Sequence, residues 1–117
     1  MIVPMIGIGQ CLSGDCKNGY GVFTNSVGTY VGEFENGRYH GQGTLVTTGV
    51  MAGSYCGEWK NGTRDGMATE HMLGISGDWL ITYIGHYKYN KRNGKGLWLQ
   101  KDGTRKEGLW RNGEFSN

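Results

Sequence analysis

Along most of this chain, aromatic or apolar residues alternate with polar ones, and Asn-Gly turns and single glycines interrupt the alternation at regular distances. The clearest stretch, from residue 30, reads YVGEFENGRYHGQGTL. In an extended chain Tyr30, Gly32 and Phe34 project to one face, whereas Val31 and Glu33 project to the other. A period of two predicts β-strands, and no glycine-free window carries an apolar stripe at helical period. The pattern therefore predicts an all-β fold.

The same order of residue classes recurs three more times. The copies are YCGEWKNGTRDGMA from Tyr55, YIGHYKYNKRNGKG from Tyr83 and a shortened KEGLWRNGEF from Lys106. In the three full copies, a glycine after the opening aromatic precedes a second one by nine residues, in the pairs Gly32 and Gly41, Gly57 and Gly66, Gly85 and Gly94. Such strict spacing indicates a repeat. We divide a single domain, 1–117, into a degenerate first repeat at 10–29, repeats at 30–54, 55–82 (with an insert) and 83–105, and a truncated last repeat at 106–117.

Each repeat is expected to form one β-hairpin. Asn36-Gly37 favours a type I′ turn, in which both central residues need positive φ. A two-residue loop with unbroken pairing places Gly32 opposite Gly41 and Tyr30 opposite Gly43, so that a ring covers a position without a side chain. The same register predicts three cross-strand pairs that differ between copies and thus indicate no shared catalytic constellation: His40 with Glu33, Glu58 with Asp65, and His86 with Asn93.

Stacked hairpins would align the aromatic residues of one face into a stripe. Such a stripe is more often the packing surface of the sheet than a ligand site. However, a single layer without helices cannot bury both of its faces, so we expect part of the stripe to remain accessible as a partner-binding groove. The residues of this groove would be Tyr30, Phe34, Tyr55, Trp59, Tyr83, Tyr87 and Trp110.

The longest connection, His71 to Thr82, is rich in apolar residues. Insertions in repeat proteins collect on one rim, which is often the recognition rim. The alternative is a longer hairpin whose apolar residues fold back on the sheet, and the sequence does not separate the two. The candidate contacts of this insert are Met72, Leu73, Ile75 and Trp79. Only four residues follow Gly113, so we expect the last hairpin to lack its return strand. This predicts an open edge that also allows a homodimer.

Composition narrows the class of protein. The 117 residues include 23 glycines, one proline and 12% aromatics, whereas disordered chains are poor in aromatics. The apolar start, MIVPMIGIGQ, lacks a basic region and is too short to span a bilayer, so we expect an edge strand or cap rather than a signal peptide or anchor. An odd set of three cysteines suits a reducing compartment and predicts a cytoplasmic protein. Cys11 and Cys16 could form half of a metal site or a disulfide, but their spacing favours a free or incidentally oxidised pair.

The net charge is only +2, but it is unevenly distributed. Residues 1–80 hold four basic and seven acidic side chains, whereas residues 81–117 hold eight basic and three acidic ones. The basic third could attract an acidic partner, although solvated turn residues explain the same charges and are the favoured interpretation. The candidate patch consists of Lys88, Lys91, Arg92, Lys95, Arg105, Lys106 and Arg111.

The quoted stretches resemble MORN (membrane occupation and recognition nexus) repeats. The family pattern is an aromatic, any residue, glycine, an acid and an aromatic, then an Asn-Gly turn and HGxG. The third copy departs from it with His86 for the acid and Asn90 for the turn glycine. The resemblance implies an open, curved, single-layer stack of antiparallel β-hairpins, a solenoid of about four repeats with an aromatic groove. It also implies scaffolding or protein binding, often with dimerisation. Acidic phospholipid binding has been proposed for the family, and small antitoxin or immunity proteins use related repeats.

No sequence motif indicates catalysis. GxSxG, HExxH and P-loop patterns do not occur, and we expect no catalytic residue, metal or cofactor. The favoured function is a non-catalytic module that binds a protein or peptide along the groove, and a small inhibitor or an immunity or antitoxin-type protein would be one form of it. The alternative is binding of acidic phospholipid or nucleic acid through the basic third, with nucleic acid disfavoured.

Overall fold

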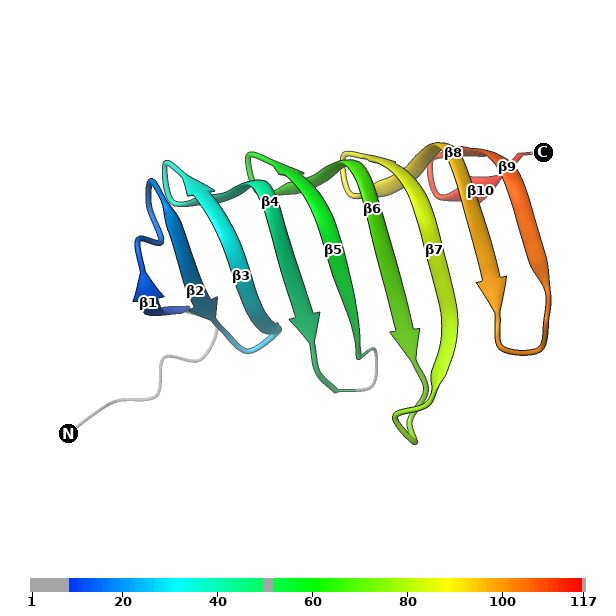
Figure 1. The fold of residues 1–117 in the computed structure, drawn as a ribbon, viewed down its shortest axis with the longest axis horizontal. Helices are drawn as coiled ribbons and strands as arrows, with labels where there is room; N and C mark the ends of the chain where they lie inside the picture. Colours follow the sequence, from blue (N-terminus) through cyan, green and yellow to red (C-terminus); the bar gives the residue numbers. More distant parts are fainter. Residues whose placement is uncertain (1–8, 50–51, 117) are drawn as a thin grey trace.

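The computed structural model describes residues 9–49 and 52–116, which form one open antiparallel sheet. Its strands follow one another in chain order, so each pairs only with its sequence neighbours (Figure 1). The predicted all-β stack of hairpins is confirmed. The strands are β1 (Gln10–Gly14), β2 (Tyr20–Thr24), β3 (Gly28–Glu35), β4 (Arg38–Thr47), β5 (Gly53–Lys60), β6 (Thr63–Leu73), β7 (Trp79–Lys88), β8 (Lys91–Gln100), β9 (Arg105–Arg111) and β10 (Glu114–Phe115).

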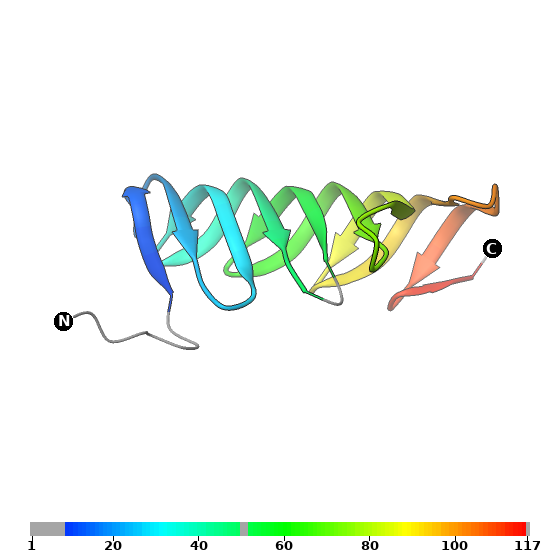
Figure 2. The same ribbon diagram turned by 90° about the horizontal axis from the view of Figure 1, so that it is seen from below.

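The sheet is one curved layer, elongated across its strands (Figure 2). Ten strands at a spacing of about 4.8 Å span roughly 45 Å, close to the longest molecular dimension of 52 Å. We call the face that carries Tyr30, Tyr55 and Tyr83 the inner face, and the face that carries Val31 and Ile84 the outer face. Within the described ranges, no helix is long and apolar enough to cross a membrane.

Tight turns join the strands at one edge of the sheet. Asn36 and Gly37 have φ of 51° and 76°, as a type I′ turn requires. The turns at Asn61-Gly62, Tyr89-Asn90 and Asn112-Gly113 likewise have positive φ at both residues. Each turn is tied to the previous hairpin: the Gly62 amide donates to the Tyr39 carbonyl at 2.9 Å, and the equivalent bonds run from Asn90 to Arg64 and from Gly113 to Arg92.

The predicted register is wrong beyond the first three of these turns, because a β-bulge follows each of them. Phe34 pairs with Tyr39 as expected, but Gly32 pairs with Gly43 instead of Gly41. The same shift occurs between Gly57 and Trp59 and between Gly85 and Tyr87. Consequently Tyr30 pairs with Leu45. The second glycine of each predicted pair instead lies in the bulge with positive φ, at Gly41, Gly66 and Gly94.

The bulge also replaces the predicted side-chain pairs. Glu33 does not bond His40; its carboxylate accepts the Gln42 amide at 2.7 Å and wraps around Gly41. His40 lies 3.3 Å from the Glu35 carboxylate. In the next repeat, Glu58 accepts the Met67 amide at 2.5 Å rather than facing Asp65, and the bulge likewise breaks the pairing of His86 with Asn93. In the first two full repeats, the acid after the first glycine therefore serves as an internal acceptor for the bulge.

Seven glycines and one alanine form a continuous row across the inner face. Each member is paired directly with the next, from β2 to β9, in the order Gly21, Gly32, Gly43, Gly57, Ala68, Gly85, Gly96 and Gly108. The opening tyrosine of each repeat leans over this row, and its hydroxyl donates to the carbonyl three residues on: Tyr30 to Glu33, Tyr55 to Glu58 and Tyr83 to His86. The prediction that the Tyr30 ring covers Gly43 therefore holds, although the residue paired with Tyr30 is Leu45.

The two ends differ from the expectations. Residues 1–8, most of the apolar start, lie outside the described residues. Cys11 and Cys16 form a disulfide with Cα atoms 5.9 Å apart, which is the oxidised one of the two states that the sequence left open for this pair. Cys56 is free and exposed on the outer face. At the other end, the last hairpin does have a return strand, but β10 is only two residues long and pairs with Trp110 and Arg111.

Candidate functional site

The seven aromatic residues predicted for the groove form one edge-to-face ladder along the inner face. Within a repeat, the rings of Tyr55 and Trp59 have centroids 4.8 Å apart at 71°. Between repeats, Tyr30 contacts Trp59 at 5.5 Å and 89°, and Tyr55 contacts Tyr87 at 5.0 Å and 82°. The edge-to-face arrangement suits the ring quadrupoles. In spatial order the ladder is Phe34, Tyr30, Trp59, Tyr55, Tyr87, Tyr83 and Trp110.

These seven side chains are the core of the protein rather than an accessible groove. Tyr30 and Tyr83 are fully buried, and none of the other five is more than 6% exposed. The expectation that part of this stripe stays accessible is therefore wrong for these residues. Burial raises the pKa of the Tyr83 hydroxyl to about 12, and it also raises the pKa of Tyr30 and Tyr55. Because these rings are buried, a partner cannot contact them directly, and any binding surface on this face must be formed by the side chains that cover them.

A second layer of side chains, which the sequence reasoning missed, covers the ladder. Its members are on the second strand of each hairpin. They are paired with the second aromatic of each repeat, namely Tyr39 with Phe34, Arg64 with Trp59 and Arg92 with Tyr87. Tyr39 stacks on Tyr30 with centroids 3.8 Å apart and planes within 6°. Arg64 lies over the Tyr55 and Tyr87 rings, and Arg92 lies over Tyr83, Trp98 and Trp110. A planar group thus covers each opening tyrosine, as an aromatic in one repeat and as a guanidinium in the next two.

Glu70 connects the two guanidinium groups. It occupies the position paired with Tyr55, which is Leu45 in the preceding repeat and Trp98 in the following one. Its carboxylate lies 3.3 Å from Arg64 Nη1 and 3.3 Å from Arg92 Nη2, and it accepts a hydrogen bond from the Tyr87 hydroxyl. Burial, followed by the Glu70 charge, raises the pKa of Tyr87. The inner face therefore carries a half-buried ionic cluster with a net positive charge.

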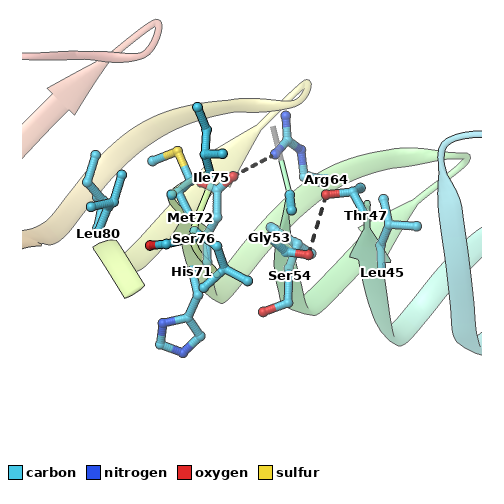
Figure 3. Close-up of a pocket in the computed structure, with 16 residues that line it drawn as sticks. Leu45, Thr47, Gly53, Ser54, Arg64, His71, Met72, Ile75, Ser76 and Leu80 are labelled. Atoms are coloured by element: carbon cyan, nitrogen blue, oxygen red, sulfur yellow. Dashed lines mark hydrogen bonds and ion pairs between the residues drawn. The ribbon is translucent and has the colours of Figure 1, made fainter. Parts of the chain in front are cut away.

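Next to this cluster, the inner face holds an apolar concavity of about 850 Å³, which we call the inner pocket (Figure 3). Leu45 and Thr47 line one side of it, and Met72, Ile75 and Leu80 line the other. Arg64 and Glu70 also line it, whereas the His71 ring points away from the labelled apolar side chains (Figure 3). The remaining lining residues are Ala52, Gly53, Ser54, Tyr55, Leu73, Gly74, Ser76 and Ile81.

The 71–82 insert forms the wall of this pocket. It lengthens β6 and β7 and closes in a tight loop, where the Gly74 amide donates to the Asp78 carbonyl at 2.8 Å. This loop projects beyond its neighbours at the lower edge of the sheet (Figure 1). Of the four predicted insert residues, Met72, Leu73 and Ile75 line the pocket, and Ile75 is 96% exposed. Trp79 does not line it, and its indole donates to the Thr82 hydroxyl.

The predicted basic residues are divided between the two faces of the sheet. Arg92 lies inside the aromatic layer, and Lys106 pairs with Trp98 on the inner face. Lys95 and Arg105 alternate to the outer face, where Arg105 binds Glu107 at 2.8 Å. Arg111, next to the buried Trp110, also projects outward. Lys88 and Lys91 flank the Tyr89-Asn90 turn.

Comparison with known protein families identifies the repeat. A family model described as MORN repeat matches residues 30–48, 55–71 and 83–105, which together make up half of the chain. The matches begin at Tyr30, Tyr55 and Tyr83, the residues at which the full repeats open. A search of curated proteins finds no match.

Proposed function

Because the chain belongs to the MORN-repeat family, whose repeats take part in binding proteins or membrane lipids, we propose that it is a non-catalytic protein-binding module. The proposed partner docks in the inner pocket, between Leu45 and the 71–82 insert. A module of this kind acts as an inhibitor, an immunity protein or a scaffold. Its expected compartment is the cytoplasm.

The observation that carries this proposal is the apolar lining of the inner pocket. Ile75 and Leu80 expose 96% and 44% of their surface at its rim, whereas the seven rings of the ladder are each at most 6% exposed. Exposed apolar side chains that surround a concavity are typical of sites where a partner buries its own apolar groups. The pocket also contains Arg64, a residue type that is enriched at the energetic centres of protein interfaces.

Membrane-lipid binding is the second candidate, and the distribution of charge argues against it. Binding to an anionic bilayer needs several basic side chains on one surface. Here Lys95, Arg105 and Arg111 project from the outer face, whereas Arg92 is held within the inner face by Glu70. A flat membrane could therefore contact only part of the set at once.

Site-specific photo-cross-linking tests the proposal. A benzophenone amino acid is placed at Ile75 in the pocket rim or, as a matched control, at Ile84, an exposed apolar residue of the outer face. Irradiation in cells of the source organism should link the position-75 variant to one defined protein and leave the position-84 variant without that product. Equal labelling from both positions, or labelling of lipid alone, would contradict docking in the inner pocket.

A sedimentation assay addresses the lipid candidate. Vesicles of phosphatidylcholine with 30% phosphatidylserine are mixed with the protein at low and moderate salt; the proposal expects the protein to remain in the supernatant. Salt-sensitive binding that is lost in a Lys95→Gln, Arg105→Gln, Arg111→Gln variant would favour the lipid function instead, since electrostatic binding to a membrane weakens steeply with ionic strength.

A further inference from the structure

A second, smaller concavity continues the inner pocket toward the hairpin turns. This polar pocket has a volume of about 150 Å³ and is lined by Arg64, Glu70, Tyr87, Asn90, Lys91, Arg92 and Gly113. Arg64 and Glu70 line both concavities, so the two are adjacent. The guanidinium groups of Arg64 and Arg92 contact the Glu70 carboxylate in the polar pocket, and Lys91 also lines it. Its chemistry therefore differs sharply from that of the apolar inner pocket beside it.

Glu70 does not use all the donors of the two guanidinium groups. An arginine carries five N–H donors. Arg64 donates from Nη1 to Glu70 and from Nη2 to the Asn90 carbonyl. Arg92 donates from Nη2 to Glu70, and its buried Nε has no partner among the described residues. Lys91 lies at the rim and is exposed. One positive charge is offset by Glu70, which leaves two in excess and several donors free.

Stacking fixes the orientation of these donors. The Arg92 guanidinium lies 4.8 Å from the Trp98 ring centroid and 5.4 Å from that of Tyr83, and Arg64 lies 5.4 Å from that of Tyr87. A guanidinium that is held over aromatic rings keeps its N–H donors pre-organised, so less side-chain entropy is lost when it binds an anion. The planar edge matches a carboxylate. The volume of the polar pocket suits one such group.

We propose that the two pockets together recognise an extended partner segment in which an apolar side chain and a carboxylate lie within a few residues of each other. The apolar side chain enters the inner pocket, and the Asp or Glu carboxylate enters the polar pocket, where Arg92, Arg64 and Lys91 hold it. This inference rests on the proposed protein-binding function and adds the chemistry of the partner. It follows that basic segments are rejected, because their charge would face Arg64 and Arg92.

The test is a selection of peptides from a phage library of random ten-residue sequences on the folded protein. The selected peptides should carry Asp or Glu within four residues of Leu, Ile, Met, Phe or Trp. Fluorescence polarisation of the synthetic peptides should then show weakening of about three- to tenfold in Lys91→Gln. Lys95→Gln, which removes an exposed lysine of the outer face, is the matched control and should change nothing. Arg92→Gln should weaken binding further if circular dichroism shows that it folds.

A double-mutant cycle locates the contact. Replacing the acid of a selected peptide by its amide should weaken binding to the wild-type protein, and it should have a smaller effect on Lys91→Gln, because the pair is already broken. Selected peptides without acidic enrichment, equal losses in both lysine variants, or recovery of no binding peptide would overturn the inference. So would peptides that bind only when phosphorylated, or binding confined to phosphatidylserine vesicles. If cross-linking at position 75 succeeds but the peptide experiments show no preference for an acidic residue, the proposed function stands and only the acidic preference is lost.

Discussion

The ring of Tyr83 lies on Gly96 so closely that a Cβ atom at residue 96 would stand 2.5 Å from Tyr83 Cζ. Tyr30 covers Gly43 in the same way two repeats earlier. These contacts explain why the repeat combines an aromatic residue with a glycine: the ring fills the inner face where the neighbouring strand carries no side chain or, at Ala68 in the repeat between these two, only a methyl group. The hydroxyl then reaches the carbonyl at the bulge, at 3.0 Å for Tyr83 and His86.

Gly96→Ala should destabilise the protein by about 1–3 kcal/mol, because the added methyl group overpacks a filled site. The change is measured as the free energy of unfolding in guanidinium chloride. Gly74→Ala is the control, since its Cβ would meet only the flexible Leu80 side chain at 3.2 Å, and it should cost less than about 0.5 kcal/mol. Equal costs for the two variants would show that the ring does not depend on the glycine.

Glu33→Ala should cost about 1–2 kcal/mol, because the Gln42 amide in the bulge loses its charged acceptor at 2.7 Å. Glu35→Ala removes a neighbouring carboxylate that makes only an exposed ion pair with His40, so it should cost less than about 0.5 kcal/mol. Chemical denaturation of both variants at pH 7 provides the comparison. A loss at Glu35 as large as that at Glu33 would contradict the role assigned to the bulge.

Stability should fall steeply as the pH rises from about 10 toward 12. Burial raises the folded-state pKa of Tyr83 from 10.0 to about 12, and it also raises those of Tyr30, Tyr55 and Tyr87. A raised pKa means that unfolding releases protons once the pH exceeds the unfolded value, so the stabilisation is complete below pH 10 and is lost above it. The midpoint of guanidinium unfolding, measured from pH 7 to 12, should be constant up to about pH 9 and then decline.

Tyr83→Phe tests the assignment of this alkaline transition. Removing the hydroxyl should lower stability at pH 7 by about 1 kcal/mol through loss of the bond to the His86 carbonyl. It should also reduce the slope of stability against pH between 10 and 12, since one fewer buried phenol must ionise. An unchanged slope would mean that the other tyrosines account for the transition.

Glu70→Leu should destabilise the protein by about 1–3 kcal/mol, because Arg64 and Arg92 lose their shared counter-ion in a half-buried site. Adding Arg64→Tyr should recover part of this loss. The double variant reproduces the first full repeat, where Tyr39 stacks on Tyr30 beside Leu45. Thermal and chemical unfolding of the single and double variants measure the recovery. If stability does not recover, a tyrosine with a leucine cannot replace an arginine with a glutamate as the cover of the opening tyrosine.

The local features of the fold were predictable because they depend on short-range physics. Asn36-Gly37 predicts its turn since both residues tolerate positive φ. The alternation around Tyr30 predicts its inner-face position because successive side chains point to opposite faces. The bulge was not predicted, although its signal was present: Gly41 and Glu33 recur in the next repeat as Gly66 and Glu58. Reading the second glycine as a pairing partner rather than as a positive-φ position shifted the register by two residues.

The sequence by itself determined that the chain is a stack of β-hairpins with its rings on one face, since the repeat length, the turns and the period of two all follow from neighbouring residues. Only the tertiary structure decided which inner-face side chains are accessible. Tyr39, Arg64 and Glu70 come from return strands whose register depends on the bulge, and they bury the ladder beneath them. Burial depends on contacts between separate strands, so the candidate site moved from the predicted rings to the pocket between Leu45 and Ile75.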